Sequence, residues 1–448
     1  MLTKTACIAL LCSLYSMSLF TSSCIAQKKN NEAPGSAELI NQAINVTEVE
    51  RIERTLAADD MQGRRPFTPG IDKAAAFIAA EFRKAGIKTV RDTTYFQEFG
   101  LIRPKVVSIT GTVNGKSLDE KELAIRSTME SLSVNEQSGY EIITIGAKDT
   151  FASKINNNWK QEKNQLFVVD TAHRQLFTRM KRPAREMFPM TGNTVYILSV
   201  EQVNNFSIEV KQELTQQQLK NVVGIIPGKS KADEYVIFSA HYDHLGIGRP
   251  NKDNDSIYNG ANDDASGVTA VIILANYFSK LQNNERTLVF SAFTAEESGG
   301  YGSTYFSRQF APEKVMAMFN IEMIGTESKW GTNSAFITGY DKTDMGMILE
   351  KNLAGSAFKF NPDPYPDQDL FYRSDNATLA RLGVPAHTIS TAKMDSNKPE
   401  PYYHSADDEI QTLDMKNMTE IIKAIAVSSV SIVKGTDTPT RVEAGKLR

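Results

Sequence analysis

Cysteine is almost missing from this chain, and the few cysteines present all lie near its start. The sequence has 448 residues and 3 cysteines, which are Cys7, Cys12 and Cys24. The remainder of the chain therefore offers no disulfide and no thiol nucleophile, and this excludes a cysteine protease. A G-x-S-x-G elbow and a phosphate-binding loop are also lacking, which argues against a serine hydrolase or a nucleotide-binding protein.

A strong excess of one charge is missing too. The chain has 50 basic and 53 acidic residues and a formal net charge of -3. This balance gives no reason to expect nucleic acid or an anionic membrane surface as a partner. The 41% hydrophobic and 23% charged content is ordinary for a globular protein, and the length predicts about two to three domains.

The first residues have the pattern of an export signal. Lys4 precedes an apolar stretch over residues 6–20, which is too short to span a bilayer. Cleavage after residue 26 would leave a soluble protein, whereas a signal ending at residue 23 would leave a lipid anchor on Cys24. We therefore expect an exported bacterial protein without a transmembrane span, either periplasmic, secreted or held at the outer membrane as a lipoprotein.

The rest of the chain divides into two kinds of pattern. Apolar strands alternate with helices over residues 221–435, and an amphipathic helix is predicted within residues 27–100, which together indicate a sheet covered by helices on both faces. Short strand-like runs alternate with polar loops over residues 101–220, which we interpret as an inserted β-rich module. Residues 436–448 are predicted to be a loose tail.

Polar side chains occur where the apolar strands of the second half end. His241 follows the strand YVIFSA, Glu296 and Glu297 follow TLVFSAF, and Glu322 interrupts the apolar run MAMFNIEMIG. Ligands of such sheets bind beyond the carboxyl ends of the strands. A carboxylate in an apolar strand is costly unless it is paired or bound to a metal, so Glu322 is the least ambiguous of these residues.

Two further motifs complete the set. Asp263 and Asp264 lie in NGANDDASG just before a predicted helix, and His404 lies in YYHSADD. Each motif alone has an ordinary explanation, such as a helix cap or a loop histidine. Two imidazoles and several carboxylates together are the ligand chemistry of a two-zinc site, and a spare glutamate is what such a site needs as a general base. His244 is expected near the site without being a ligand.

These motifs, in this order, resemble the M28 family of zinc metallopeptidases over about residues 60–100 and 220–430. The resemblance implies an α/β/α sandwich around a mixed, largely parallel sheet, and two zinc ions per chain. It also implies that residues 101–220 stand where many members carry an apical or protease-associated domain. Many members have Asp in place of Glu322, so the second zinc is expected to sit differently or bind more weakly.

The resemblance also implies a role for each motif residue. Asp263 would bridge the zinc ions with a cis peptide bond to Asp264, and Glu296 would be the general base. The remaining expected residues are the ligands of one zinc (Glu297 and His404), those of the other (His241 and Glu322), the supporting carboxylates (Asp243, Asp264 and Asp408), the tyrosine that steadies the tetrahedral intermediate (Tyr403) and the pocket-lining loop (Ser374, Asp375 and Asn376).

The resulting hypothesis is an exported aminopeptidase that acts on peptides, and three alternatives stay open. A glutaminyl cyclase would use a single zinc on the same scaffold. A carboxypeptidase of the glutamate type would need basic residues in the substrate pocket. A receptor-like binding protein would typically have lost ligands or the base, and here every expected position holds a competent residue.

Overall fold

The computed structural model describes residues 36–90, 93–181, 186–395 and 398–443. The expected export signal over residues 1–26, with Cys24, lies outside the described residues. Within the described part, none of the helices has both the length and the apolar character needed to cross a bilayer.

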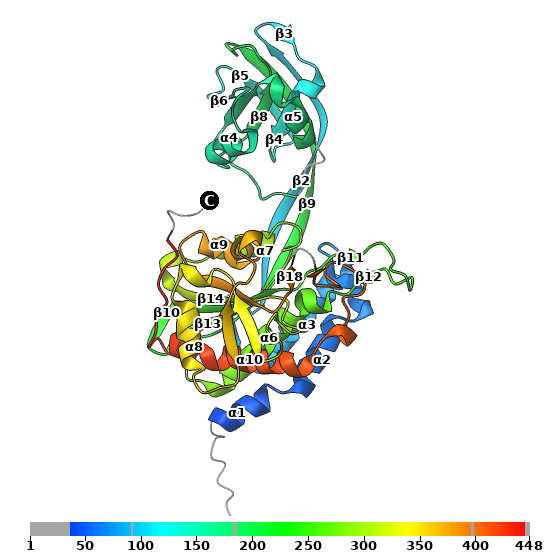
Figure 1. Ribbon diagram of the computed structural model, residues 1–448. Coiled ribbons are helices and arrows are strands. Elements are labelled where there is room, and N and C mark those ends of the chain that lie inside the picture. Colours follow the sequence, from blue (N-terminus) through cyan, green and yellow to red (C-terminus); the bar gives the residue numbers. More distant parts are fainter. Residues whose placement is uncertain (1–35, 91–92, 182–185, 396–397, 444–448) are drawn as a thin grey trace, which may run out of the picture.

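A mixed sheet of 11 strands runs through the larger part of the molecule (Figure 1). Nine of its strands follow the order β16-β15-β17-β14-β10-β13-β9-β2-β3, and β1 and β5 each pair with β9 outside this order. Its centre is parallel: β10 (Lys231–His241) pairs with β13 (Arg286–Phe293) and β14 (Val315–Ile321), and β14 pairs with β17 (Ala386–Ser390). On the other side of β13, β9 (Phe206–Ile226) is antiparallel. The expected mixed sheet is therefore confirmed, with the parallel pairing concentrated in the middle.

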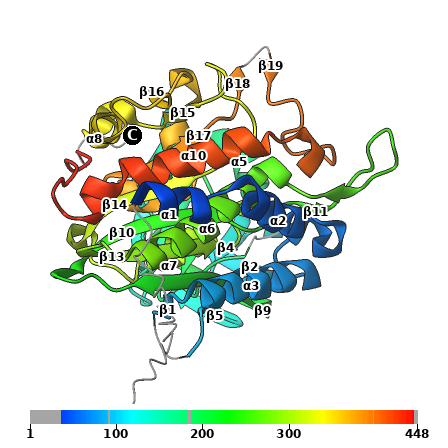
Figure 2. The same cartoon turned by 90° about the horizontal axis from the view of Figure 1, so that it is seen from below.

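Helices cover both faces of this sheet, because side chains alternate between two cores along each buried strand. Phe238 on β10 packs in the core that includes α6 (Ser266–Leu281), whereas its neighbour Ile237 packs in the core that includes α7 (Tyr301–Ser307) and α9 (Asn376–Ala380). Figure 2 shows α6 and α10 running across the strands on the first face. The expected α/β/α sandwich is confirmed. The other helices that contribute to the α6 core are α1 (Ser36–Ala43), α2 (Val46–Leu56), α3 (Pro69–Ala85), α8 (Met345–Asn352), α10 (Met415–Ser428) and α11 (Val430–Val433).

The amphipathic helix predicted before residue 100 is α3. Pro69 occupies its first turn, where a missing N–H costs nothing. Gly86 ends it in the left-handed conformation (φ 72°), and its N–H donates to the carbonyl of Phe82. The remaining strands are short and are β1 (Lys88–Thr89), β3 (Lys116–Ser117), β5 (Ser131–Asn135), β11 (Gly246–Ile247), β12 (Ile257–Tyr258), β15 (Ser334–Ile337), β16 (Lys359–Pro362), β18 (Met394–Asp395) and β19 (Lys398–Pro399).

A smaller region stands away from the sandwich on two long strands, β2 (Phe96–Val113) and β9 (Figure 1). It contains a second sheet in the order β4-β8-β7-β6 and two helices, α4 (Phe151–Asn158) and α5 (Arg174–Met180). We call residues 101–220 the apical module and keep its boundaries as a prediction, since β2 and β9 both continue into the central sheet. Its helices were not expected, because each spans only two turns. The strands of its sheet are β4 (Leu123–Arg126), β6 (Glu141–Ile145), β7 (Gln165–Val169) and β8 (Thr194–Leu198).

The prediction of a loose tail from residue 436 is wrong for residues 440–442. Arg441 donates hydrogen bonds to the carbonyls of Val315 and Pro312, and the N–H of Thr440 donates to Asp344. The side chain of Val442 is 5% exposed and packs in the α7 and α9 core. A single apolar residue in a polar stretch gives no periodic signal, which is why the sequence did not reveal this contact.

Candidate metal centre

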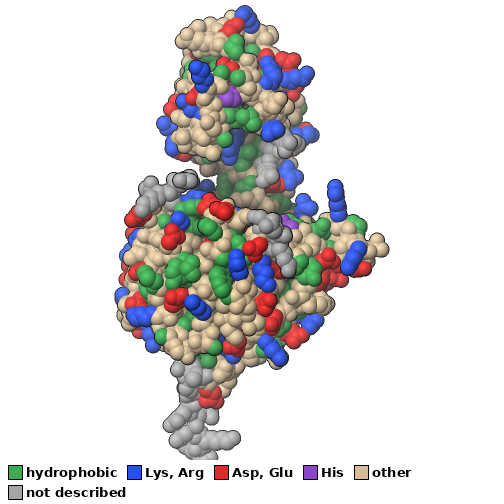
Figure 3. All heavy atoms as spheres, viewed as in Figure 1, with side chains coloured by type: hydrophobic (Ala, Val, Ile, Leu, Met, Phe, Trp, Pro, Cys, Tyr) green, Lys and Arg blue, Asp and Glu red, His purple; other side chains and the backbone are tan. Residues whose placement is uncertain are grey.

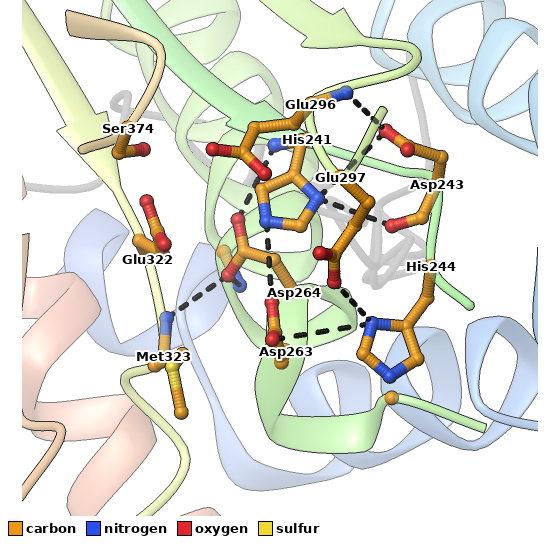
Figure 4. A network of polar contacts seen from close by, with 12 residues as sticks. His241, Asp243, His244, Asp263, Asp264, Glu296, Glu297, Glu322, Met323 and Ser374 are labelled. Atoms are coloured by element: carbon orange, nitrogen blue, oxygen red, sulfur yellow. Dashed lines mark hydrogen bonds and ion pairs between the residues drawn. The ribbon is translucent and has the colours of Figure 1, made fainter. Parts of the chain in front are cut away.

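The polar motifs meet at one edge of the central sheet. His241 is the last residue of β10, Glu296 and Glu297 come soon after β13, and Glu322 directly follows β14. Because these three strands are parallel neighbours, their carboxyl ends bring the side chains together (Figure 4). The apolar run predicted that Glu322 interrupts a strand. In the structure β14 ends at Ile321, and the carboxylate of Glu322 points into the site.

Two groups of metal-ligand atoms share one carboxylate. His241, Asp263 and Glu322 offer donor atoms within 4.8 Å of one another, and so do His244, Asp263 and Glu297. The Oδ1 atom of Asp263 lies 3.2 Å from Nε2 of His241, whereas its Oδ2 atom lies 4.0 Å from Nδ1 of His244 (Figure 4). Asp263 thus stands between the two groups with one oxygen directed to each.

Two imidazoles, those of His244 and His404, lie close to the carboxylate of Glu297. The Nε2 atom of His404 lies 3.3 Å from Oδ2 of Asp263 and 3.2 Å from Oε1 of Glu297. Nδ1 of His244 lies 3.0 Å from the same glutamate oxygen. His244 is fully buried, while the side chain of His404 is 35% exposed. The expectation that His244 lies near the site without being a ligand stays a prediction, since the geometry offers both His244 and His404 as donors beside Glu297.

The donor set fits zinc. Nε2 of His244 is buried without a hydrogen-bond partner in the described part of the chain, whereas Nδ1 of His244 and Nε2 of His404 face only the carboxylates of Glu297 and Asp263. Buried polar atoms are costly unless something binds them. Imidazole nitrogens and carboxylate oxygens are the donors that zinc takes in catalytic sites. The residues present could therefore hold zinc in both groups.

The imidazoles of the site lower the pKa of two carboxylates, and this favours the ionised form that binds cations. Burial alone would raise the pKa of Asp263, but His241 and His404 hold it well below its ordinary value. Burial likewise opposes ionisation of Glu297, yet His244 and His404 lower its pKa to about 2. Asp263 also raises the pKa of His404 against the effect of burial. A metal ion would therefore have to displace protons from the imidazoles, so its affinity should fall in acid.

Backbone hydrogen bonds hold the shared aspartate in place. The two carboxylate oxygens of Asp408 accept from the N–H groups of Asn262 and Asp263, at 2.8 Å and 3.1 Å. Asp264 accepts from the N–H groups of His241, Gly267 and Met323, so it joins three segments of the site (Figure 4). The peptide bond between Asp263 and Asp264 is cis, and that prediction is confirmed.

Asp243 supports the site in a different manner from the one expected. Its carboxylate lies 3.8 Å from Nδ1 of His241, but its main-chain carbonyl is closer, at 3.1 Å. The Oδ1 atom of Asp243 instead accepts a hydrogen bond from the N–H of Glu296 at 3.0 Å. Asp243 therefore orients the imidazole of His241 through its main-chain carbonyl. Its side chain fixes the start of the loop that contains Glu296 and Glu297.

A buried arginine, Arg64, ties two loops of the site to the end of α2. The guanidinium of Arg64 is 0% exposed and donates to the carbonyls of Tyr242, Leu56, Asn259 and Gly260. These carbonyls flank the strand end at His241 and the loop that leads to Asp263. In the stretch MQGRRPF nothing distinguishes Arg64 from its exposed neighbour Arg65, so no sequence signal could have revealed this role.

Glu296 and Tyr403 line the cavity beside the two donor groups, and neither belongs to them. Burial raises the pKa of Glu296 well above its ordinary value, and the nearby carboxylates of Glu322 and Asp375 add to the rise, although His241 opposes it. Burial also raises the pKa of Tyr403, so its hydroxyl stays protonated. The site therefore has one carboxylate suited to accept a proton and one hydroxyl suited to donate a hydrogen bond.

The cavity has a volume of about 300 Å³, and only part of the expected loop lines it. Ser374 lies on its wall, where its Oγ accepts a hydrogen bond from Asn320 at 2.8 Å. Asn376 is buried behind the wall and donates to the carbonyls of Phe371 and Ala386. Asp375 is also buried and does not reach the cavity. Ser374 is thus the member of the loop that a substrate would meet.

Comparison with known proteins assigns the class of this domain. Residues 221–429 match the sequence model of Peptidase family M28. The "Probable leucine aminopeptidase" of Trichophyton verrucosum is 32% identical over 212 residues, which cover 45% of this chain and 54% of the relative. A "Probable zinc metalloprotease" of Pyricularia oryzae is 34% identical over 113 residues, 25% of this chain and 22% of the relative. The chain spans about half the length of the curated leucine aminopeptidases it matches.

Among solved structures, an aminopeptidase from Aneurinibacillus sp. strain AM-1 superposes with a TM-score of 0.53 at 16% identity, covering 92% of this chain and 98% of the other. A likeness at this identity shows the shared fold. Residues 221–429, which carry the metal centre, therefore match the peptidases of family M28, and the expected resemblance is confirmed over these residues.

Proposed function

We propose that the protein is an aminopeptidase that uses two zinc ions and removes N-terminal residues from peptides. The observation that carries the proposal is the position of Asp263, whose two oxygens face different groups of donors (Figure 4). One group would be completed by His241 and Glu322, and the other by Glu297 with His404 or His244. A carboxylate so placed can bridge a pair of ions.

The roles of the chain's own groups follow from their positions. Bound zinc would polarise the scissile carbonyl and lower the pKa of water. Glu296 lines the cavity outside both donor groups, so it would take the proton from the attacking water and return it to the leaving amine. The protonated hydroxyl of Tyr403 would donate a hydrogen bond to the carbonyl oxygen as that oxygen gains negative charge.

The test is hydrolysis by the zinc-loaded protein before and after Glu296→Gln. We expect release of p-nitroaniline from leucyl-p-nitroanilide by the parent chain, and a fall in kcat of about 10²–10⁴-fold in the variant, because a general base contributes about this much. Zinc content and melting temperature should stay unchanged. Glu313→Gln, on an exposed glutamate away from the cavity, is the matched control and should keep full activity.

Other products would contradict the proposal in distinct ways. Ring closure of N-terminal glutamine without hydrolysis would favour a glutaminyl cyclase. Release of C-terminal glutamate would favour the carboxypeptidase. Zinc binding with no turnover of any of these substrates would favour a receptor-like protein on a peptidase scaffold.

We also propose that the protein is exported, on the pattern of residues 1–26. N-terminal sequencing of the protein recovered from outside the cytoplasm tests this. A mature chain beginning at residue 27 would indicate a soluble enzyme, and a lipid-modified residue 24 would indicate an anchored one. Retention of the full chain in the cytoplasm would contradict export.

A further inference from the structure

One arginine side chain lines the cavity beside the metal centre. Its described lining includes carboxylates from Asp263, Glu296, Glu297 and Glu322, and Arg373 is its only arginine or lysine. Apart from the imidazole of His404, the rest of the wall is apolar or carries hydroxyl groups.

The guanidinium of Arg373 makes no ion pair or hydrogen bond with any described residue, and the side chain is exposed. Two other arginines of the sandwich are engaged: Arg381 stacks on the ring of Tyr372, and Arg308 stacks on the ring of Phe188. Arg373 and Tyr403 line the same cavity, and the charge of Arg373 opposes the rise in the pKa of that hydroxyl, which burial mainly causes. An unpaired guanidinium is thus presented to the cavity close to a residue of the proposed machinery.

The backbone around Arg373 is firmly held, so the cation is presented from a fixed turn. Its N–H donates to the carbonyl of Leu370 at 3.2 Å. The next residue, Ser374, is tied to Asn320, and Asn376 is tied to the backbone on two sides. A guanidinium with five donors matches a carboxylate in a bidentate manner, and its planar fork loses less entropy per hydrogen bond than a lysine ammonium would.

We propose that Arg373 binds a carboxylate of the substrate and makes the enzyme selective for short anionic peptides. The inference rests on the proposed aminopeptidase function and deepens it. A cavity of about 300 Å³ is at the small end of the range of ligand sites, which suits one or two residues. The carboxylate comes either from the free C-terminus of a dipeptide or from an acidic N-terminal side chain, and the two sources share the same chemistry.

The test compares matched substrates with and without the carboxylate. We expect kcat/KM to be higher for leucyl-alanine than for leucyl-alanine amide. Arg373→Gln should lower it about tenfold or more for the free acid, mainly through KM, and less than about twofold for the amide, because a charge-assisted contact is lost only where the carboxylate exists. Arg373→Lys should restore part of the difference. Arg381→Gln, an exposed arginine outside the cavity, is the matched control.

A second pair of substrates distinguishes the source of the carboxylate. If glutamyl-p-nitroanilide is preferred over glutaminyl-p-nitroanilide and Arg373→Gln removes that preference, the acidic side chain is the ligand. If only the dipeptide pair responds, the C-terminus is the ligand. Equal losses for charged and neutral substrates, or no loss for either pair, would overturn the proposal.

Binding separates this inference from the proposed function. Calorimetry with zinc-loaded Glu296→Gln should give a Kd about tenfold lower for leucyl-alanine than for its amide, and adding Arg373→Gln should abolish the difference. A parent chain that hydrolyses none of the substrates would refute the aminopeptidase while leaving this binding result to decide on Arg373. An equal Kd for the two ligands would refute carboxylate recognition whatever the activity.

Discussion

The sandwich and the apical module differ in what they bury. Described residues of the sandwich bury charged or ionisable side chains in number, among them Glu53, Arg64, Arg286 and Asp408 together with the metal-site residues. In the described part of residues 101–220, the buried polar side chains are all uncharged. They are Ser127, Gln165, Asn193, Thr194 and Gln212.

This difference shows that the cost of burying charged groups falls in the sandwich. Burying a charge is expensive unless it is paired or bound to a metal, so such residues persist where they have a task. In the sandwich they form the metal centre and the contacts that hold its loops. The described part of the module instead has two small apolar cores and buries no charged side chain.

The two regions meet through an aromatic cluster beside the loop of Glu296 and Glu297. Phe188 of the module contacts Tyr301 edge-on and packs against Phe99 with ring centroids 6.0 Å apart, and Phe99 in turn stacks on Tyr305. Tyr301 also donates a hydrogen bond to the carbonyl of Glu186, and it begins α7 directly after the loop that contains Glu296. Elsewhere the connection is narrow and carries exposed apolar surface (Figure 3). The module is therefore linked to the glutamate loop at one place.

The largest expected effect comes from removing the buried cation of the sandwich. Arg64→Leu would leave four backbone carbonyls without their donor and nearby carboxylates without a counter-charge. We expect the free energy of unfolding of the metal-free protein to fall by about 3–5 kcal/mol, as when a buried ionic contact is broken. Denaturant unfolding measures it. Arg65→Leu is the matched control, and an equal loss there would show that Arg64 has no special role.

The buried Glu53 of the sandwich should make the stability of the protein depend on pH. Burial raises the pKa of Glu53 to about 8, although the hydrogen bond from Thr269 opposes this. Between the ordinary pKa of 4.5 and this value the folded chain holds a proton that the unfolded chain has lost. The free energy of unfolding should therefore fall as the pH rises from about 5 to 8.

Glu53→Gln removes this titrating group and isolates its contribution. The fall in stability between about pH 5 and 8 should be smaller in the variant by on the order of 2 kcal/mol. Unfolding curves at several pH values check this. Parallel pH profiles for the parent and the variant would mean that Glu53 does not hold a proton in the folded protein.

The smallest effect is expected at the junction. Phe188→Ala removes ring contacts with Phe99, Tyr301 and Arg308, and its side chain is only partly buried. A loss of stability of about 1 kcal/mol is expected, because aromatic pairs contribute about 0.5–1.5 kcal/mol beyond burial. Hydrogen exchange at residues 296–301 should rise as well. Val107→Ala on the exposed part of β2 is the control, and faster exchange there but not in Phe188→Ala would contradict the link.

Much of the fold and of the site could be predicted because both depend on strands that end in polar residues. Alternating apolar strands and helices indicated the covered sheet, and His241, Glu297 and Glu322 stood at strand ends that a parallel sheet brings together. Other features leave no pattern. His244 shares a motif with a stronger candidate, and Arg373 looks like any loop arginine until the cavity is seen. Tertiary packing decides which of these side chains lie at the site, and spacing along the chain does not encode it.

Zinc content tests directly whether Asp263 joins two zinc positions. The parent protein, dialysed against a slight excess of zinc and then freed of it, should hold two zinc ions per chain by elemental analysis. Asp263→Ala should lose most of both while remaining folded, and Asp253→Ala, an exposed aspartate in a surface turn, should keep both. One zinc or none in the parent, or two in Asp263→Ala, would contradict a bridging role for Asp263.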